Sequence, residues 1–189
     1  MKTFEEITTV LGKETKLSLM SFEDSDRMRW KELFDMWKGF KIGMREYKAR
    51  EPNFPEGLSE VAFCLFSGSY RVLPSRSSKV SNSFDTFNLD SGRAEQIKAT
   101  GIKKDLTSFR PKSKWDDLYF LDFFNNDKLD GTFNVFKIPN ELIYSHKVNK
   151  LETFTQQQDQ RLRPRLSIIN SIIKVHNIEA VAVDVKVWL

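Results

Sequence analysis

Three residues of this chain have the types and the spacing of a catalytic site: Asp85, Gln96 and Lys98. They lie in NSFDTFNLDSGRAEQIKAT, residues 82–100, where two strand-like runs flank the turn-forming residues Asp-Ser-Gly. The pattern predicts a β-hairpin, with Asp85 on its first strand and a Gln-x-Lys triplet on its second. Residues two apart on a strand point to the same side, so we expect Gln96 and Lys98 to share one face of a sheet.

A carboxylate beside an amide and a lysine suits metal-dependent hydrolysis of a phosphodiester. A divalent ion can position water, neutralise the phosphoryl oxygens and stabilise the leaving oxygen. Mg²⁺ prefers oxygen ligands and keeps several waters, so one or two carboxylates with other oxygens are sufficient. We expect Asp85 to be the main ligand, beside the Gln96 side-chain carbonyl and the Ile97 backbone carbonyl, with Lys98 orienting the attacking water.

The length of the hairpin loop decides which residue faces Asp85. A two- or four-residue loop around residues 90–93 places Asp85 across from Lys98, whereas a three-residue loop places it across from Ile97. The same residues also fit a surface hairpin with a solvated lysine and no catalytic role.

Helices and strands interleave along the rest of the chain. Residues 1–12 are expected to form a short helix, and Ser21 to Arg50 a long one bearing aromatic residues from Trp30 to Phe40. A largely apolar helix from about Glu56 to Phe66 carries Glu60, whose carboxylate must face water, a partner or a metal. Further strands are expected at residues 118–124, 131–138 and 178–189, with helical segments at 139–144 and 167–178. The interleaving predicts an α/β protein with a mixed central sheet flanked by helices and an N-terminal helical extension.

The composition favours a soluble protein from a reducing compartment. The 189 residues carry a formal charge of +4, which is a weak indication of a nucleic-acid partner. Cys64 is the only cysteine, so no intrachain disulfide can form. No apolar run is long enough to cross a membrane, and the first residues do not resemble a signal peptide. We therefore expect a cytoplasmic protein without a membrane partner.

Candidate DNA-contacting residues cluster late in the chain, in QQQDQRLRPR at residues 156–165. Arginine can bond bidentately to guanine, and glutamine to adenine or phosphate. We therefore expect contacts from Gln158, Arg161, Arg163 and Arg165, and an extended segment would aim the three arginines the same way. Basic loops before and after the hairpin add residues suited to the DNA backbone: Arg76, Lys79, Lys112 and Lys114. Lone surface arginines are also commonly just solvated.

Four blocks, in this order, resemble a known family: NFPEGLSEVAFC, SFDTFNLDSGRAEQIKAT, LTSFRPKSKWDDLYFLDFF and VNKLETFTQQQDQRLRPRLSI. Together they cover about Asn53 to Ile169. The combination is similar to the small type II restriction endonucleases that recognise GCNGC, the Bsp-six-I type, within the PD-(D/E)xK nuclease superfamily. The resemblance implies a restriction-endonuclease-like core over residues 51–189, with residues 1–50 as a helical part of the same domain.

The resemblance also implies a homodimeric, Mg²⁺-dependent enzyme that cuts double-stranded DNA at a short palindromic site. Asp85 matches the acidic metal ligand, Gln96 and Lys98 match the Q-x-K pair, and Glu60 matches a helix glutamate that can assist the metal. A cognate DNA methyltransferase would be its genetic partner. A palindromic site calls for a twofold dimer, and the helix from Trp30 to Phe40 is the first candidate for its contact.

Other functions fit some of the same features. A DNA repair nuclease could use the same metal site. A catalytically silent or regulatory DNA-binding protein could keep the fold, since Gln96 stands where glutamate is commoner. A purely structural α/β domain would explain the hydrophobic pattern, and its Lys98 would simply be exposed to solvent.

Overall fold

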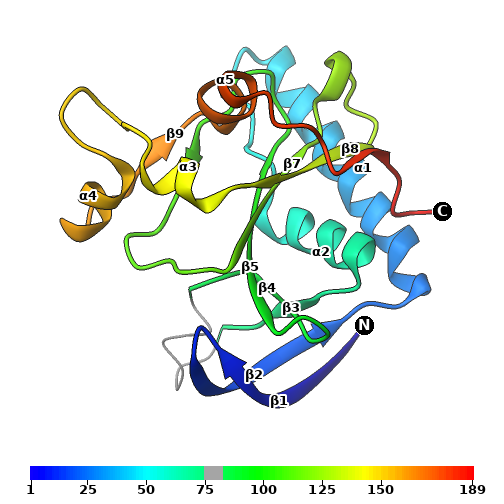
Figure 1. The fold of residues 1–189 in the computed structure, drawn as a ribbon. Coiled ribbons are helices and arrows are strands. Elements are labelled where there is room, and N and C mark those ends of the chain that lie inside the picture. Colours follow the sequence, from blue (N-terminus) through cyan, green and yellow to red (C-terminus); the bar gives the residue numbers. More distant parts are fainter. Residues whose placement is uncertain (75–82) are drawn as a thin grey trace.

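The protein is built around one mixed sheet of eight strands, in the order β1-β2-β3-β4-β5-β7-β8-β10 (Figure 1). The computed structural model describes residues 1–74 and 83–189. The strands of this sheet are β1 (Lys2–Val10), β2 (Lys13–Ser21), β3 (Tyr70–Val72), β4 (Thr86–Asn88), β5 (Arg93–Thr100), β7 (Asp117–Asp122), β8 (Phe133–Ile138) and β10 (Ala182–Val185). Neighbouring strands are antiparallel except β5 and β7, which run parallel. The predicted α/β class with a mixed central sheet is confirmed.

Helices and a second small sheet complete the described fold. The helical segments are α1 (Asp24–Glu46), α2 (Glu56–Ser67), η1 (Asn125–Asp127), α3 (Asn140–Tyr144), α4 (Phe154–Asp159), η2 (Ile169–Ile173) and α5 (Lys174–His176). The small sheet pairs β6 (Thr107–Ser108) with β9 (Arg165–Leu166). Within the described ranges, no helix is long and apolar enough to cross a membrane.

The N-terminal region differs from the prediction, because its first 21 residues form a β-hairpin and not a helix. Leu11 and Gly12 both have positive φ and connect β1 to β2 in a tight turn. Leu17 and Leu19 are buried while their neighbours are more exposed, which is the period of a strand. Because β2 pairs with β3, the hairpin belongs to the main sheet. The predicted helical extension is therefore wrong for residues 2–21 and right only for α1.

Helices α1 and α2 cover one face of the main sheet, on the right of the central strands in Figure 1. Trp30, Phe34 and Trp37 of α1 are buried in a core shared with Phe123 and Phe133 from the sheet side. This aromatic stripe therefore stabilises the fold of one chain and is not available for a subunit contact. The prediction that the helix from Trp30 to Phe40 forms the dimer contact therefore rests on its other residues.

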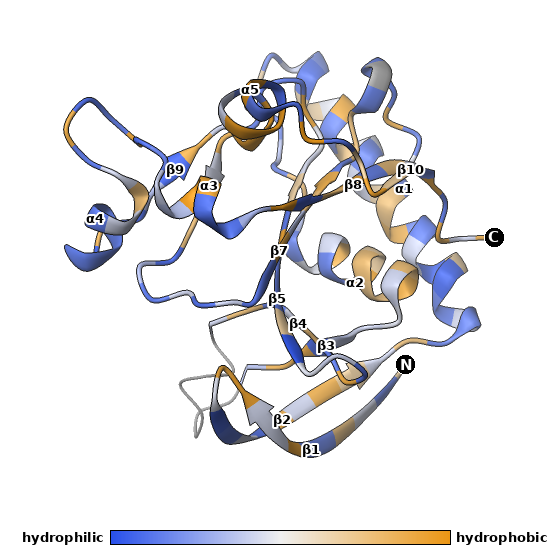
Figure 2. Cartoon of the chain, viewed as in Figure 1, coloured by the Kyte–Doolittle hydropathy of each residue, from blue (hydrophilic) through white to orange (hydrophobic). Residues whose placement is uncertain are grey.

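The opposite face of the sheet is covered by the later elements of the chain. Ala94 on β5 and Phe120 on β7 pack in a second core with Phe109, Phe154 and Ile168. Figure 1 shows α3, α4 and β9 on the left of the central strands, and Figure 2 shows that the segment around α4 is largely hydrophilic. Because side chains alternate along β5, Gln96 and Lys98 point to the same face as Ala94. The candidate catalytic residues therefore lie on the face that β6, β9 and α4 approach.

Candidate active site

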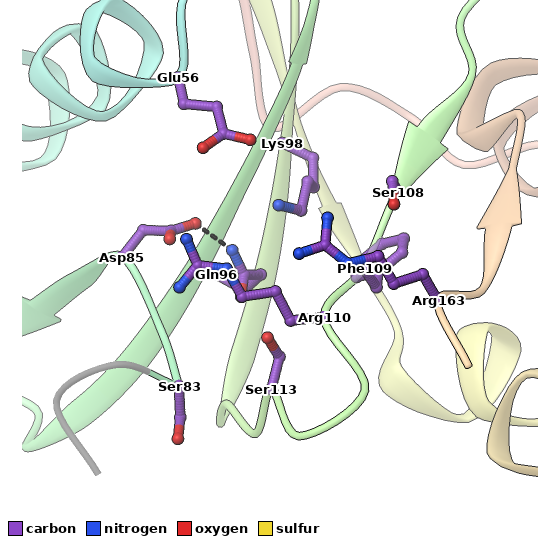
Figure 3. Close-up of a pocket in the computed structure, with 10 residues that line it drawn as sticks. All are labelled: Glu56, Ser83, Asp85, Gln96, Lys98, Ser108, Phe109, Arg110, Ser113 and Arg163. Atoms are coloured by element: carbon purple, nitrogen blue, oxygen red, sulfur yellow. Dashed lines mark hydrogen bonds between the residues drawn. The ribbon is translucent and has the colours of Figure 1, made fainter. Parts of the chain in front are cut away.

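A polar pocket lies on this second face, beside the start of β4 and the middle of β5 (Figure 3). Its lining residues come from α2, the segment before β4, β5, the end of β6 with the segment after it, and the segment before β9: Glu56, Ser83, Asp85, Gln96, Lys98, Ser108, Phe109, Arg110, Ser113 and Arg163. Three of the four predicted catalytic residues, Asp85, Gln96 and Lys98, are therefore brought together.

The register of the hairpin differs from both predicted alternatives. Asn88 pairs with Arg93, so a four-residue loop begins at Leu89, one residue earlier than expected. The Asn88 side chain fixes this turn, since its Oδ1 accepts a hydrogen bond from the Ser91 N–H at 2.9 Å. Asp85 consequently lies beside Gln96 and not across from Lys98 or Ile97.

Asp85 is held by neighbours on β5. Its Oδ2 accepts hydrogen bonds from the Gln96 side-chain amide and from the Ile97 N–H, the latter at 2.9 Å. Burial raises the pKa of the Asp85 carboxyl, and the Glu56 charge adds to the rise, while Lys98, the Ile97 N–H and Arg110 oppose it. The carboxylate therefore sits in a site where added positive charge would stabilise it.

Glu56, and not the predicted Glu60, is the α2 carboxylate that lines the pocket (Figure 3). Glu60 Oε2 instead accepts a hydrogen bond from Arg71 Nε at 2.5 Å, and its side chain is 12% exposed. Burial and the charge of Asp85 raise the pKa of Glu60 to about 7 against the opposing bond from Arg71. The two glutamates are four residues apart on one helix face, a spacing that could have drawn attention to Glu56.

The arginines of the late basic block do not act as one extended row. Arg161 has a φ of 62° in the turn after α4, and Arg165 lies exposed on β9. Only Arg163 reaches the pocket. The prediction that an extended segment aims all three side chains the same way is therefore wrong, because the turn at Arg161 breaks the alternation. Gln158 bonds within the chain, donating from Nε2 to the Arg110 carbonyl at 3.2 Å.

The remaining predicted basic residues lie outside the pocket or outside the described residues. Lys112 and Lys114 are exposed and flank the buried Ser113, which does line the pocket. Arg76 and Lys79 fall in residues 75–82, which the structure does not describe. Arg110 was not predicted as a site residue, although it lies in LTSFRPKSKWDDLYFLDFF, one of the four blocks that carry the family resemblance.

The oxygen donors of the pocket fit a hard divalent cation better than a soft one. Across residues 1–74 and 83–189, no group of three or more His, Cys, Asp or Glu side chains is arranged to hold a metal. Glu56 and Asp85 nevertheless supply two carboxylates at one pocket, beside the Gln96 amide. Two carboxylates with an amide oxygen and water suit Mg²⁺, which dehydrates reluctantly.

Comparison with known proteins identifies the family. The model of the Bsp6I restriction endonuclease family matches residues 22–175, a range that contains every residue lining the pocket. The chain belongs to this family. The type II restriction enzyme Bsp6I of Bacillus sp. (strain RFL6) is 29% identical over 178 residues, which cover 88% of this chain and 93% of that enzyme. No solved structure matches the chain.

Membership of the Bsp6I family makes the chain a type II site-specific deoxyribonuclease. The predicted enzyme class is confirmed, and with it the expectation that DNA is the partner. The pocket of this endonuclease combines carboxylates with cationic side chains, a combination that suits binding of a metal ion and of an anionic phosphodiester.

Proposed function

We propose that this endonuclease hydrolyses double-stranded DNA with Mg²⁺ at a short palindromic site, and that the site is GCNGC. One observation carries the catalytic part: Asp85, Glu56, Gln96 and Lys98 converge on a single pocket of a chain that belongs to a restriction endonuclease family. The proposed recognition sequence, GCNGC, rests on the resemblance of the four sequence blocks to the known family.

Asp85 is the proposed main metal ligand, with Glu56 as the second carboxylate and the Gln96 amide oxygen beside them. The Ile97 carbonyl is the proposed backbone ligand. Its N–H already points to Asp85, and in a strand the N–H and C=O of one residue face the same neighbour. A bound divalent ion supplies Lewis-acid polarisation of the phosphate and a more acidic water.

Lys98 is the proposed residue beside the attacking water. In the reaction, a water oxygen bonds to phosphorus and gives up a proton to the solvent, the P–O bond to the leaving sugar oxygen breaks, and that oxygen takes up a proton from the solvent. The Lys98 amine points into the pocket from the strand that carries Gln96 (Figure 3). From there it can orient the water and offset the negative charge that develops on the phosphoryl oxygens.

A homodimer is proposed because a palindromic site presents two equivalent half-sites. Helix α1 still offers a contact surface, since Met36 is 64% and Phe40 60% exposed beside the buried stripe. Sedimentation velocity with and without DNA tests this state, and a monomer under both conditions would contradict it.

Five further residues are proposed to contact DNA around the pocket: Arg161, Arg165, Gln158, Lys112 and Lys114. We also propose a cytoplasmic location and a cognate DNA methyltransferase as genetic partner.

The test uses two synthetic duplexes that differ in one base, one containing GCAGC and the other GCAGA. With Mg²⁺, we expect cleavage of the first duplex only, at one position in each strand, and no cleavage after chelation by EDTA. Sequencing of fragment ends from digested plasmid DNA then reports the site and the cut position without assuming either.

Other results would select a different function. Discrete fragments that map to another sequence would keep the endonuclease and replace GCNGC. Preferred nicking of branched DNA would favour a repair nuclease. Binding to duplex DNA without cleavage under any divalent ion would favour a catalytically silent DNA-binding protein.

A further inference from the structure

The small sheet places two arginines from distant parts of the chain opposite each other. Thr107 pairs with Leu166 and Ser108 with Arg165, and the Phe109 N–H donates to the Pro164 carbonyl at 3.0 Å. Extending this register beyond the two strands sets Arg110 opposite Arg163. Both are lining residues of the pocket. The pairing of β6 with β9 therefore delivers two guanidinium groups to the same place as Lys98.

A buried aspartate anchors this arrangement. Asp105 is 6% exposed and accepts hydrogen bonds from the Ile168 N–H at 2.6 Å and from Ser167 Oγ at 2.5 Å. It thereby ties the segment before β6 to the segment after β9. The two arginines are consequently presented by segments that adjoin this anchored ladder, Arg110 just after β6 and Arg163 just before β9.

The two guanidinium groups carry charge that the described part of the chain does not neutralise by ion pairing. Like charges directly opposite each other across a ladder are destabilising. Neither Arg110 nor Arg163 forms a salt bridge with a residue in 1–74 or 83–189, whereas Arg45, Arg71 and Arg93 each do. In Figure 3, Arg110 extends toward Asp85 and Arg163 toward Lys98. An anion bound between them would relieve the repulsion.

We propose that Arg110 and Arg163 form a clamp that binds the reacting phosphodiester, with Arg163 contacting a non-bridging oxygen of the scissile phosphate. Planar guanidinium groups bind phosphate oxygens bidentately, and the contact strengthens as charge accumulates on those oxygens. This proposal rests on the proposed function and gives Arg163 a catalytic role in place of base reading. A phosphate contact carries no sequence information, whereas a base contact does.

The test separates these two roles by comparing cleavage rates at different sequences. After fragment-end sequencing defines the preferred site, single-turnover rates are measured on that duplex and on duplexes with one base changed. We expect Arg163→Ala to slow cleavage of every duplex by a similar factor of about 10²–10³, as for loss of one preorganised donor. Arg163→Lys should restore part of the rate on all of them. Lys174→Ala, which removes one exposed positive charge from α5, is the matched control and should cleave like the wild type.

Three outcomes would overturn the clamp. Arg163→Ala could retain the wild-type rate within about threefold, which is well below the loss of a transition-state contact. It could instead slow the preferred duplex selectively, which would identify a base reader. A lowered thermal midpoint that accounts for the lost activity would identify a structural role. If the wild-type protein cleaved no duplex, the proposed function itself would be refuted. Failure of the clamp and failure of the proposed function are therefore distinguishable.

Discussion

Two charged clusters lie on opposite faces of β5 and differ in how their charges are balanced. On the face toward α2, the Asp117 carboxylate accepts hydrogen bonds from Arg93. It also forms an ion pair with Lys137, whose Nζ lies 2.9 Å from Asp117 Oδ1. Asp117 is 7% exposed, so its carboxylate is buried, whereas the side chains of Arg93 and Lys137 are about half exposed. In this cluster each charged side chain forms an ion pair within the chain, and its role is to stabilise the pairing of β5, β7 and β8.

The pocket face has the opposite character. Five charged side chains converge there, and none forms a salt bridge within the described ranges: Glu56, Asp85, Lys98, Arg110 and Arg163. Charges that a fold gathers without pairing them are candidates for binding external charges. The compensated cluster therefore belongs to folding, and the uncompensated one is the site proposed for the reaction.

Replacing Asp85 by asparagine should have the largest effect. We expect Asp85→Asn to lower the single-turnover cleavage rate by more than about 10³-fold, beyond the loss of a single polarising donor, because the anionic oxygen donor is removed. The free energy of unfolding should change by less than about 1 kcal/mol, since asparagine can accept the same hydrogen bonds and no ion pair is lost. Cleavage at the wild-type rate would show that Asp85 is not a metal ligand.

Glu56 and Glu60 provide a sharper comparison, because they share one face of α2. Glu56→Gln should lower cleavage by about 10²-fold at limiting Mg²⁺ and raise the Mg²⁺ concentration needed, as expected for a weakened metal site. Glu60→Gln should lower it by less than about tenfold, because Arg71 already occupies that carboxylate. Titration of activity with Mg²⁺ measures both. If Glu60→Gln lost more cleavage activity than Glu56→Gln, Glu60 and not Glu56 would be the α2 glutamate that assists the metal.

Asp117→Asn tests the compensated cluster and should have the smallest effect on cleavage. Unfolding free energy should fall by about 2 kcal/mol, less than for a fully buried pair because Arg93 and Lys137 are about half exposed. Cleavage should stay within about threefold of wild type, well under the loss expected for a polarising donor.

The same variant has an expected pH dependence. Burial alone would raise the pKa of Asp117, but the bonds and charges of Arg93 and Lys137 hold it below its ordinary value of 3.8. Such a group contributes stability above its unfolded pKa and loses it as the pH falls through the folded pKa. Denaturant unfolding should therefore show the difference from wild type at pH 7 and a shrinking difference below pH 4. A difference that persists at lower pH would mean that packing, and not charge, is lost.

The sequence was sufficient to predict that Gln96 and Lys98 share one face, because strand parity depends only on local spacing, whereas the position of Asp85 depended on the hairpin register. It could not set the hairpin register, since the Asn88 side chain selects where the loop begins. Likewise, helix spacing fits Glu56 and Glu60 equally, and only Arg71 on a separate strand distinguishes them.

Other differences have similar causes. Residues 13–21 alternate as a strand does, but the helix predicted for residues 1–12 takes no account of the hairpin that this strand forms with them. Arg110 and Arg163 meet through a ladder of two-residue strands, which are too short to leave a periodic pattern.

The pairing of β6 with β9 also bears on when the protein becomes competent to cut. Glu56, Asp85 and Lys98 come from the first 100 residues, but β9 follows far later in the chain. Contacts between distant segments form slowly, because loop closure must precede them. A growing chain that has already folded its acidic residues and lysine therefore still lacks Arg163. If the proposed clamp is needed for cleavage, a nascent or truncated chain cannot damage host DNA, and activity begins only when the last third of the protein has docked.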